Sequence, residues 1–301
     1  MIDKARELII KSCKRQDFDH LALCYFDLSN KNSQSLEFHN GLEGSIENFY
    51  FDLASMTKVL GMGLLRVKRP QLFKGDKELL LEHRGGLPRW AILGKTSWQE
   101  TVKRFEIKAS DTEYSDLSML RLMLTLEEEE DRSFYELVKD QFSKEVCFWK
   151  DLPENATCPD TGIRKGNIIN GVVNDDNCFK INRFCSHAGL FGTIEGVREM
   201  LFRAQQEYQL TGIMQDAFKE GRTNRFLYGW DTVSDPSKSL AGKNAPSQTF
   251  GHLGFTGTSV WIDAQSGKGW ILLTNATRKY WYNRSEINAL RISLGQLLWN
   301  K

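Results

Sequence analysis

Segments with the pattern of β-strands lie near both ends of this 301-residue chain, and segments with the pattern of α-helices fill the middle. His20–Asp27 is an apolar run of strand length, and a polar turn separates it from a second strand at 36–39. Near the other end, residues 228–233, 258–263 and 269–275 are rich in β-branched and aromatic side chains. We therefore expect both ends of the chain to contribute strands to one antiparallel sheet.

Apolar residues recur at helical spacing over much of the remaining sequence, in segments at 2–15, 55–67, 97–104, 117–126, 134–142, 194–206 and 286–298. The first and last of these helices would cover one face of the sheet. We predict an α+β fold in which the antiparallel sheet is flanked by the terminal helices and carries an inserted, mainly helical domain. The sheet domain would be discontinuous, comprising 1–57 and 225–301, with 58–224 as the helical domain. A site is expected at their interface, because clefts between domains are common binding places.

Residues 150–186 are rich in turn-forming residues and contain no long periodic segment. A loop region of this length inside a compact fold usually has a function or forms a lid. We therefore expect either a long ordered loop region or a set of short excursions, with a functional or lid role.

The composition excludes several classes of function. The net charge is +1 and the pI about 7.6, so no strong field attracts nucleic acid or an anionic membrane. No apolar run approaches the ~18 residues that a spanning helix needs. The six cysteines form no C-x-x-C pair, and the five histidines form no H-x-x-x-H pair. We predict no metal site, no cofactor and no nucleic-acid or membrane partner.

The N-terminal segment lacks an uninterrupted apolar stretch and a small-residue cleavage site. We therefore expect a cytoplasmic protein with reduced thiols, acting on a small molecule. The sequence does not indicate an oligomeric state.

Ser55 is followed by Lys58 three residues later, at the start of a predicted helix. This spacing places the hydroxyl and the amine on one face, where a neutral lysine can take the serine proton. Apolar neighbours would lower the lysine pKa from ~10.4 towards 7–8. The pattern is short, and the alternative is an ordinary helix start with a solvated lysine. No other serine in the chain has a lysine at i+3.

Two further segments carry candidate chemistry. Tyr114 precedes Asp116 by two residues, and a tyrosine near a lysine can pass protons between nucleophile and leaving group, because the cation favours its anion. His252-Leu-Gly254 opens a predicted strand, and the N–H groups of Ser55 and Phe255 could together bind an oxyanion. Each segment also fits a purely structural role.

Some residues fall outside these motifs. We interpret His83 and His187 as side chains that hold loops. Trp90, Trp230 and Trp261 could line a cleft, but a position in the core is the preferred interpretation.

Taken together and in order, these segments resemble the motifs of the serine β-lactamase/penicillin-binding-protein superfamily, in particular its class C-like branch of DD-carboxypeptidases, D-aminopeptidases and carboxylesterases. The similar segments are 51–59, 114–116 and 252–254, with 80–88, 174–191 and 255–263. The resemblance implies a β-lactamase-like fold over nearly the whole chain. It also implies the following roles: Ser55 as nucleophile, Lys58 as base, Tyr114 as proton relay, and Asp116, His252, Gly254 and Phe255 in substrate or oxyanion binding.

The chain departs from the family pattern at informative positions. Asp116 stands where the second motif has asparagine, and His252 stands where the third has lysine, so a positive charge is mostly absent there at pH 7. We therefore predict a serine hydrolase that forms an acyl-enzyme on an ester or a peptide/amide bond, either esterase-like or DD-peptidase-like. The alternative is a catalytically weak or inactive binding or sensor protein with the same fold.

Overall fold

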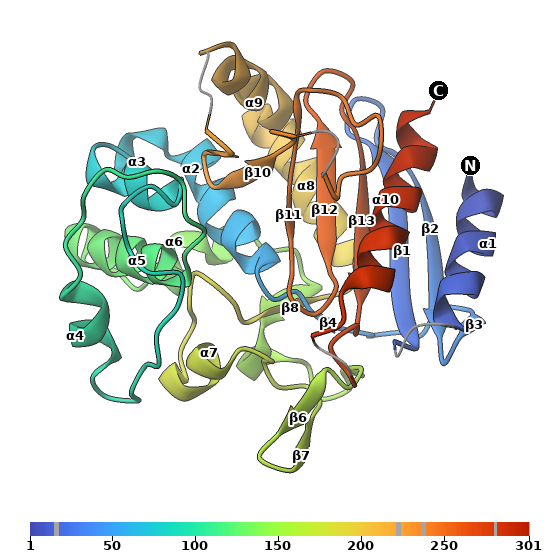
Figure 1. Cartoon of the computed structure of the whole chain (residues 1–301), viewed down its shortest axis with the longest axis horizontal. Helices are drawn as coiled ribbons and strands as arrows, with labels where there is room; N and C mark the ends of the chain where they lie inside the picture. The colour runs from blue at the N-terminus through green and yellow to red at the C-terminus, as the bar shows by residue number, and fades with distance from the viewer. Residues whose placement is uncertain (15–17, 221–223, 236–238, 280–281, 301) are drawn as a thin grey trace.

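The computed structural model describes residues 1–14, 18–220, 224–235, 239–279 and 282–300. Its main feature is an eight-stranded antiparallel sheet with the strand order β3-β2-β1-β13-β12-β11-β10-β9 (Figure 1). The strands are β1 His20–Asp27, β2 Asn32–His39, β3 Leu42–Glu43, β9 Phe226–Leu227, β10 Trp230–Thr232, β11 Thr249–Leu253, β12 Ser259–Asp263 and β13 Lys268–Thr274. The two ends of the chain meet in this sheet where β1 pairs with β13. The predicted α+β class and the shared antiparallel sheet are confirmed.

Strand β1 has no polar face because both faces of the sheet are covered. Leu21, Leu23 and Tyr25 pack in one apolar cluster with the terminal helices α1 (Ile2–Cys13) and α10 (Ser285–Trp299). The alternate residues Ala22 and Cys24 belong to a larger cluster that includes α8 (Ile194–Tyr208). A strand buried on both faces requires the continuous apolar run that the sequence shows.

The helices between the two groups of strands lie partly on the other side of the molecule and partly against the sheet (Figure 1). They are α2 Leu64–Lys68, α3 Asp76–Leu81, α4 Trp98–Lys103, α5 Asp116–Glu130, α6 Phe134–Val138, α7 Asp176–Ile181, α8 and α9 Leu210–Lys219. Helix α8 belongs to the proposed helical domain by residue number, but it also contacts β1 and β13. The division into 1–57 with 225–301 and 58–224 remains our proposal.

Short elements connect these helices. The 3-10 turns are η2 Pro70–Leu72, η3 Lys139–Gln141 and η4 Trp149–Asp151, and the small strands are β4 Phe51–Asp52, β5 Val146–Phe148 and β8 Leu190–Gly192. The strands β4, β8 and β5 form a three-stranded sheet. Strand β4 therefore fixes the backbone immediately before Ser55.

The turn-rich region forms short excursions, which is one of the two expected alternatives. It contains the hairpin of β6 (Gly162–Arg164) and β7 (Asn167–Ile169), followed by α7. Arg164 fastens the hairpin to α7, because its Nε donates to Asp176 at 2.7 Å. Within the described residues, no helix combines the length and apolar character needed to cross a bilayer.

Some predicted elements differ from the structure. Strand β2 begins at Asn32, inside the segment expected to be a turn, and β11 and α9 were not predicted. Strand β11 contains Gly251, a residue that weakens a strand pattern. The glycine is needed there because a Cβ would lie 2.0 Å from the Val260 carbonyl oxygen.

Candidate active site

Ser55 and Lys58 are brought together by a tight turn. In this turn, each backbone N–H donates to the carbonyl oxygen three residues earlier, at 3.0–3.1 Å; the donors are Met56, Thr57 and Lys58. The chain then enters the π-helix η1 (Lys58–Gly63). With three residues per turn, side chains at i and i+3 lie directly above one another. Lys58 Nζ accordingly donates to Ser55 Oγ at 2.9 Å.

The backbone before the serine is held in an unusual conformation. Ala54 has φ +46°, in the left-handed region that a residue with a Cβ rarely adopts. Asp52 stabilises it, because its Oδ1 accepts from Ala54 N at 2.8 Å and its Oδ2 from Asn174 N at 2.7 Å. Burial raises the Asp52 pKa to about 6 despite these bonds. Strain of this kind is typical of functional sites, where surrounding structure enforces it.

Lys58 is only 2% exposed and has several polar partners. Its Nζ lies 2.7 Å from Asp116 Oδ1 and donates to the His187 carbonyl at 2.8 Å. Burial disfavours the ammonium, but attraction and hydrogen bonding to Asp116 outweigh it, and the Lys58 pKa is raised. The prediction that the Lys58 pKa falls towards neutrality is therefore wrong. Asp116 is the reason, since an ion pair at this distance favours the charged amine.

Tyr114 lies beside this lysine, with Lys58 Nζ 5.1 Å from its ring centre. The ring packs against His83 at 4.8 Å and Phe226 at 5.9 Å between centres. Burial raises the Tyr114 pKa, and Lys58 opposes the shift without reversing it. The expectation that the cation favours a phenolate is therefore not met in the resting site, and Tyr114 keeps its proton.

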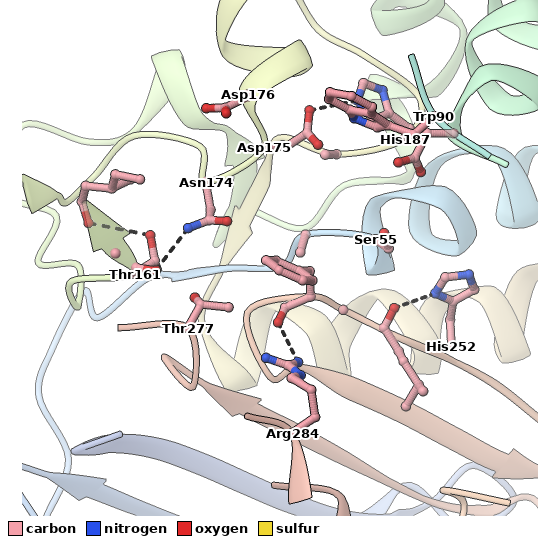
Figure 2. Close-up of a pocket in the computed structure, with 18 of the residues that line it drawn as sticks. Ser55, Trp90, Thr161, Asn174, Asp175, Asp176, His187, His252, Thr277 and Arg284 are labelled. Carbon is pink, nitrogen blue, oxygen red and sulfur yellow. Dashed lines mark hydrogen bonds and ion pairs between the residues drawn. The ribbon is translucent and has the colours of Figure 1, made fainter. Parts of the chain in front are cut away.

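His252 is buried on β11 as a neutral side chain. Its Nδ1 lies 2.8 Å from the Leu253 carbonyl, and its Nε2 has no hydrogen-bond partner among the described residues (Figure 2). Burial and nearby Lys58 lower the His252 pKa to about 3. The absence of a positive charge at this position agrees with the sequence analysis. A ligand carboxylate would therefore find no cation in His252.

Gly254 and Phe255 follow His252 at the end of β11. A Cβ on Gly254 would lie 1.9 Å from Thr258 Oγ1 and 2.7 Å from the Leu53 carbonyl oxygen, so only glycine fits between these two residues. The Ser55 N–H donates to no described residue. Its pairing with Phe255 N–H as an oxyanion site remains a prediction.

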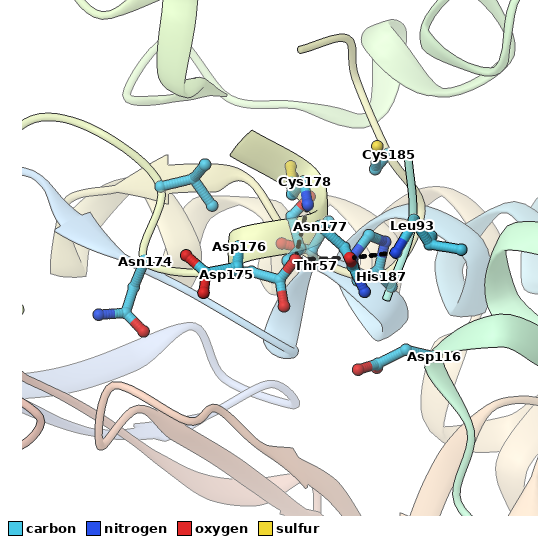
Figure 3. A network of polar contacts seen from close by, with 12 residues as sticks. Thr57, Leu93, Asp116, Asn174, Asp175, Asp176, Asn177, Cys178, Cys185 and His187 are labelled. Atoms are coloured by element: carbon cyan, nitrogen blue, oxygen red, sulfur yellow. Dashed lines mark hydrogen bonds and ion pairs between the residues drawn. The ribbon is translucent and has the colours of Figure 1, made fainter. Parts of the chain in front are cut away.

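His187 and Asp175 form a second polar pair beside Lys58, and sequence reasoning missed this role for Asp175. Figure 3 shows the Asp175 carboxylate directed at His187, with Nε2 and Oδ1 3.0 Å apart. Burial would raise the Asp175 pKa, but His187 lowers it to about 2. Asp175 also accepts from Cys178 N at the start of α7. The pair positions the His187 carbonyl that binds Lys58. An Asn-Asp-Asp run before a helix is the only sequence signal for it.

His83 supports the same site from a different loop. Its Nδ1 accepts from Ser115 N at 3.1 Å, which fixes the backbone between Tyr114 and Asp116. The interpretation of His83 and His187 as loop-holding residues fits these contacts.

These residues open into one large cavity of about 1680 Å³ (Figure 2). Ser55, Tyr114, Asp116, His252, Gly254 and Phe255 all contribute to its lining, whereas Lys58 lies beneath it. Trp230 and Trp261 are core residues, as preferred. Trp90 is 49% exposed and lines the cavity, so its placement in the core is wrong.

Comparisons with known proteins identify the family and the fold of the chain. The β-lactamase family model matches residues 78–292, a range that contains Tyr114, Asp116 and His252 but begins after Lys58. No curated protein sequence matches the chain significantly.

Two solved structures illustrate the shared fold. A class C β-lactamase from Rhodobacter sphaeroides has a TM-score of 0.62 at 12% identity, covering 98% of this chain and 99% of its own. A β-lactamase from Mycobacterium bovis has a TM-score of 0.57 at 14% identity, covering 94% and 96%. The matched range spans well over half of the chain, and the chain therefore belongs to the β-lactamase family.

Proposed function

We propose that this protein is a serine acyl hydrolase that works through an acyl-enzyme on Ser55. The observation that carries the proposal is the 2.9 Å contact between Lys58 Nζ and Ser55 Oγ at the edge of a large cavity. A serine hydroxyl needs an adjacent base to become a nucleophile, and a lysine in direct contact can be that base. Membership of the β-lactamase family supports hydrolase chemistry.

The resting ion pair sets the order of proton transfers. Lys58 first releases one proton to solvent, and its neutral amine then takes the Ser55 proton as Oγ bonds to the substrate carbonyl. The N–H groups of Ser55 and Phe255 bind the oxyanion. The Tyr114 phenol supplies a proton to the leaving group as its bond to carbon breaks, and regains one from Lys58. Water then attacks the acyl carbonyl and restores Ser55.

The expected substrate is an ester, or an amide or peptide with a small acyl group. Neutral His252 provides no cation for the carboxylate of a β-lactam, and Asp116 cannot donate a hydrogen bond to a substrate carbonyl when ionised. Both features favour esters, whose leaving groups depart more readily than amines.

A turnover assay tests this proposal. p-Nitrophenyl acetate and butyrate, a D-amino-acid p-nitroanilide and nitrocefin are offered to wild type, Ser55→Ala and Lys58→Ala, with Ser97→Ala as a matched serine control. Ester turnover that is lost in both site variants and kept in Ser97→Ala supports the hydrolase. Turnover that survives in Ser55→Ala overturns it.

One observation favours a second function, a binding or sensor protein. The ion pair between Lys58 and Asp116 holds the base in its charged form, which opposes acylation. A protein that binds without turnover would show ligand binding at the cavity and no esterase activity that depends on Lys58.

A further inference from the structure

The cavity is larger than the proposed chemistry requires. Its volume of about 1680 Å³ exceeds the roughly 300–1,000 Å³ of ordinary small-molecule pockets. Beyond Ser55, the cavity continues between the β6–β7 hairpin, α7 and the segment after β13. A small acetyl or peptide-like group would leave most of this space filled with water.

The outer part of the cavity exposes large apolar side chains. Ile163 on the hairpin is 70% exposed, Trp90 49%, Phe255 48% and Phe179 on α7 40%, and all four line the cavity. Exposed apolar groups gathered in one concave place usually mark a binding site for apolar material. Burying them under a ligand would release ordered water and favour binding.

The charges around this apolar surface are unequal. The carboxylates that line the cavity are each matched by a neighbour: Asp116 by Lys58, Asp175 by His187, Asp176 by Arg164 and Asp231 by Arg225. By contrast, Lys165 and Lys180 face the cavity without an ion-pair partner in the described part of the chain. The surplus charge of the cavity wall is therefore positive.

Arg284 adds a buried donor to this positive wall. Its Nη2 donates to the Phe255 carbonyl at 2.6 Å, while its Nη1 is buried and has no hydrogen-bond partner within the described ranges. Thr277 also lies in the cavity wall, and its Oγ1 is buried without a hydrogen-bond partner among the described residues. Buried polar atoms are normally hydrogen-bonded, so these two groups are short of an acceptor, and Arg284 brings a positive charge to the cavity wall.

We propose that the substrate is an anionic amphiphile, an ester or amide with a large apolar chain on the Ile163, Phe179 and Phe255 surface and an anionic group near Arg284. This inference rests on the proposed acyl hydrolysis for the identity of the scissile bond, but the binding itself does not require catalysis.

Binding to Ser55→Ala separates the two proposals, because this variant cannot form an acyl-enzyme. Isothermal titration with decanoate, butyrate, decanol and decyltrimethylammonium compares chain length and charge independently. Each buried methylene contributes about 0.8 kcal/mol, so decanoate should bind at least about tenfold more tightly than butyrate even if the chain is only partly covered. Decanoate should also bind more tightly than the cationic chain.

Variants assign the binding to this surface. Phe179→Ser should weaken decanoate binding about three- to tenfold, whereas Leu42→Ser, at an exposed apolar residue on β3 outside the cavity, should leave it unchanged. Arg284→Gln should weaken decanoate but not decanol, and Arg132→Gln, at an exposed arginine outside the cavity, should weaken neither.

The outcomes are distinct. Equal affinity for butyrate and decanoate, or equal losses in Phe179→Ser and Leu42→Ser, overturns the inference even if short esters are hydrolysed. Tight decanoate binding without turnover of any ester overturns the proposed function and leaves the ligand class standing.

Discussion

The Lys58 ammonium lies 2.7 Å from the Asp116 carboxylate while it also donates to Ser55 Oγ at 2.9 Å. The same nitrogen therefore contacts both the proposed nucleophile and a carboxylate that keeps it charged. Lys58 is buried, whereas the Asp116 side chain is 20% exposed at the cavity wall, so water screens this pair less than a surface pair and the charged amine is favoured. The resting site therefore holds the proposed base in its charged form, and this has direct consequences for the expected rate and pH dependence.

Asp116→Asn should raise activity. Removing the carboxylate lowers the Lys58 pKa, so a larger fraction of the amine is neutral at pH 7, and each pKa unit changes that fraction about tenfold. We expect kcat/KM for p-nitrophenyl acetate to rise at least about tenfold at pH 7. The rising limb of the pH–rate profile should move to lower pH.

Asp216→Asn is the matched control for this change, because Asp216 is exposed on α9. It should leave the profile unchanged. A folded Asp116→Asn protein with lower activity and an unshifted limb would show that Asp116 assists the reaction.

Tyr114→Phe should reduce turnover and keep the fold. The phenylalanine ring can retain the contacts with His83 and Phe226, but it has no proton for the leaving group. Loss of a positioned proton donor costs about 10²–10⁴ in rate. We expect kcat to fall by that factor with an unchanged melting temperature. Tyr135→Phe, outside the cavity, should match wild type, and a Tyr114→Phe enzyme of full activity would exclude the relay.

Gly254→Ala should destabilise the protein and disable the site. The added Cβ would overlap Thr258 Oγ1 and the Leu53 carbonyl, which belongs to the backbone leading to Ser55. Overpacking of this kind costs about 1–3 kcal/mol. Urea unfolding should show a lower midpoint. Gly212→Ala on α9, where the nearest side-chain atom would be 3.8 Å away, should be neutral or slightly stabilising. Equal stability of the two variants would contradict the close approach at Gly254.

The stability of the protein should depend on His252 below neutral pH. The His252 pKa of about 3 in the folded protein lies below the ordinary value of 6.5. Between these two pH values, the unfolded chain binds a proton at His252 and the folded chain does not. The contribution of neutral His252 is therefore complete above about pH 6.5 and is lost as the pH falls towards 3.

His252→Asn tests this dependence, because its amide can still donate to the Leu253 carbonyl. The free energy of unfolding should fall less between pH 6.5 and 4.5 in the variant than in wild type. Asp52 has a raised pKa, so its effect on stability with falling pH is opposite to that of His252. This effect is the same in both proteins and cancels in the difference. Identical slopes would show that His252 titrates normally.

The sequence predicted the contact between Ser55 and Lys58, because a spacing of three residues is a local property of one turn. It could not predict the sign of the Lys58 pKa shift. Apolar neighbours in the sequence indicated desolvation, but the carboxylate that reverses the shift comes from the start of α5, far along the chain. Long-range charge pairs of this kind depend on tertiary packing.

The fold was predictable where a segment shows a strong pattern. β1 and the terminal helices follow from apolar runs, whereas β11 was missed because Gly251, required by close strand packing, interrupts its pattern. Trp90 was misplaced for a different reason. Residue type alone favours the core for tryptophan, but a cavity wall can expose half of an aromatic side chain.

The most direct test of the account is covalent labelling of the nucleophile. Wild-type protein is treated with a fluorophosphonate, and the adduct is located by intact mass and peptide mapping, with Ser55→Ala and Ser97→Ala treated in parallel. We predict a single adduct on Ser55 in wild type and Ser97→Ala, and none in Ser55→Ala. An adduct on another residue, or equal labelling of Ser55→Ala, would contradict the assignment of Ser55 as the nucleophile.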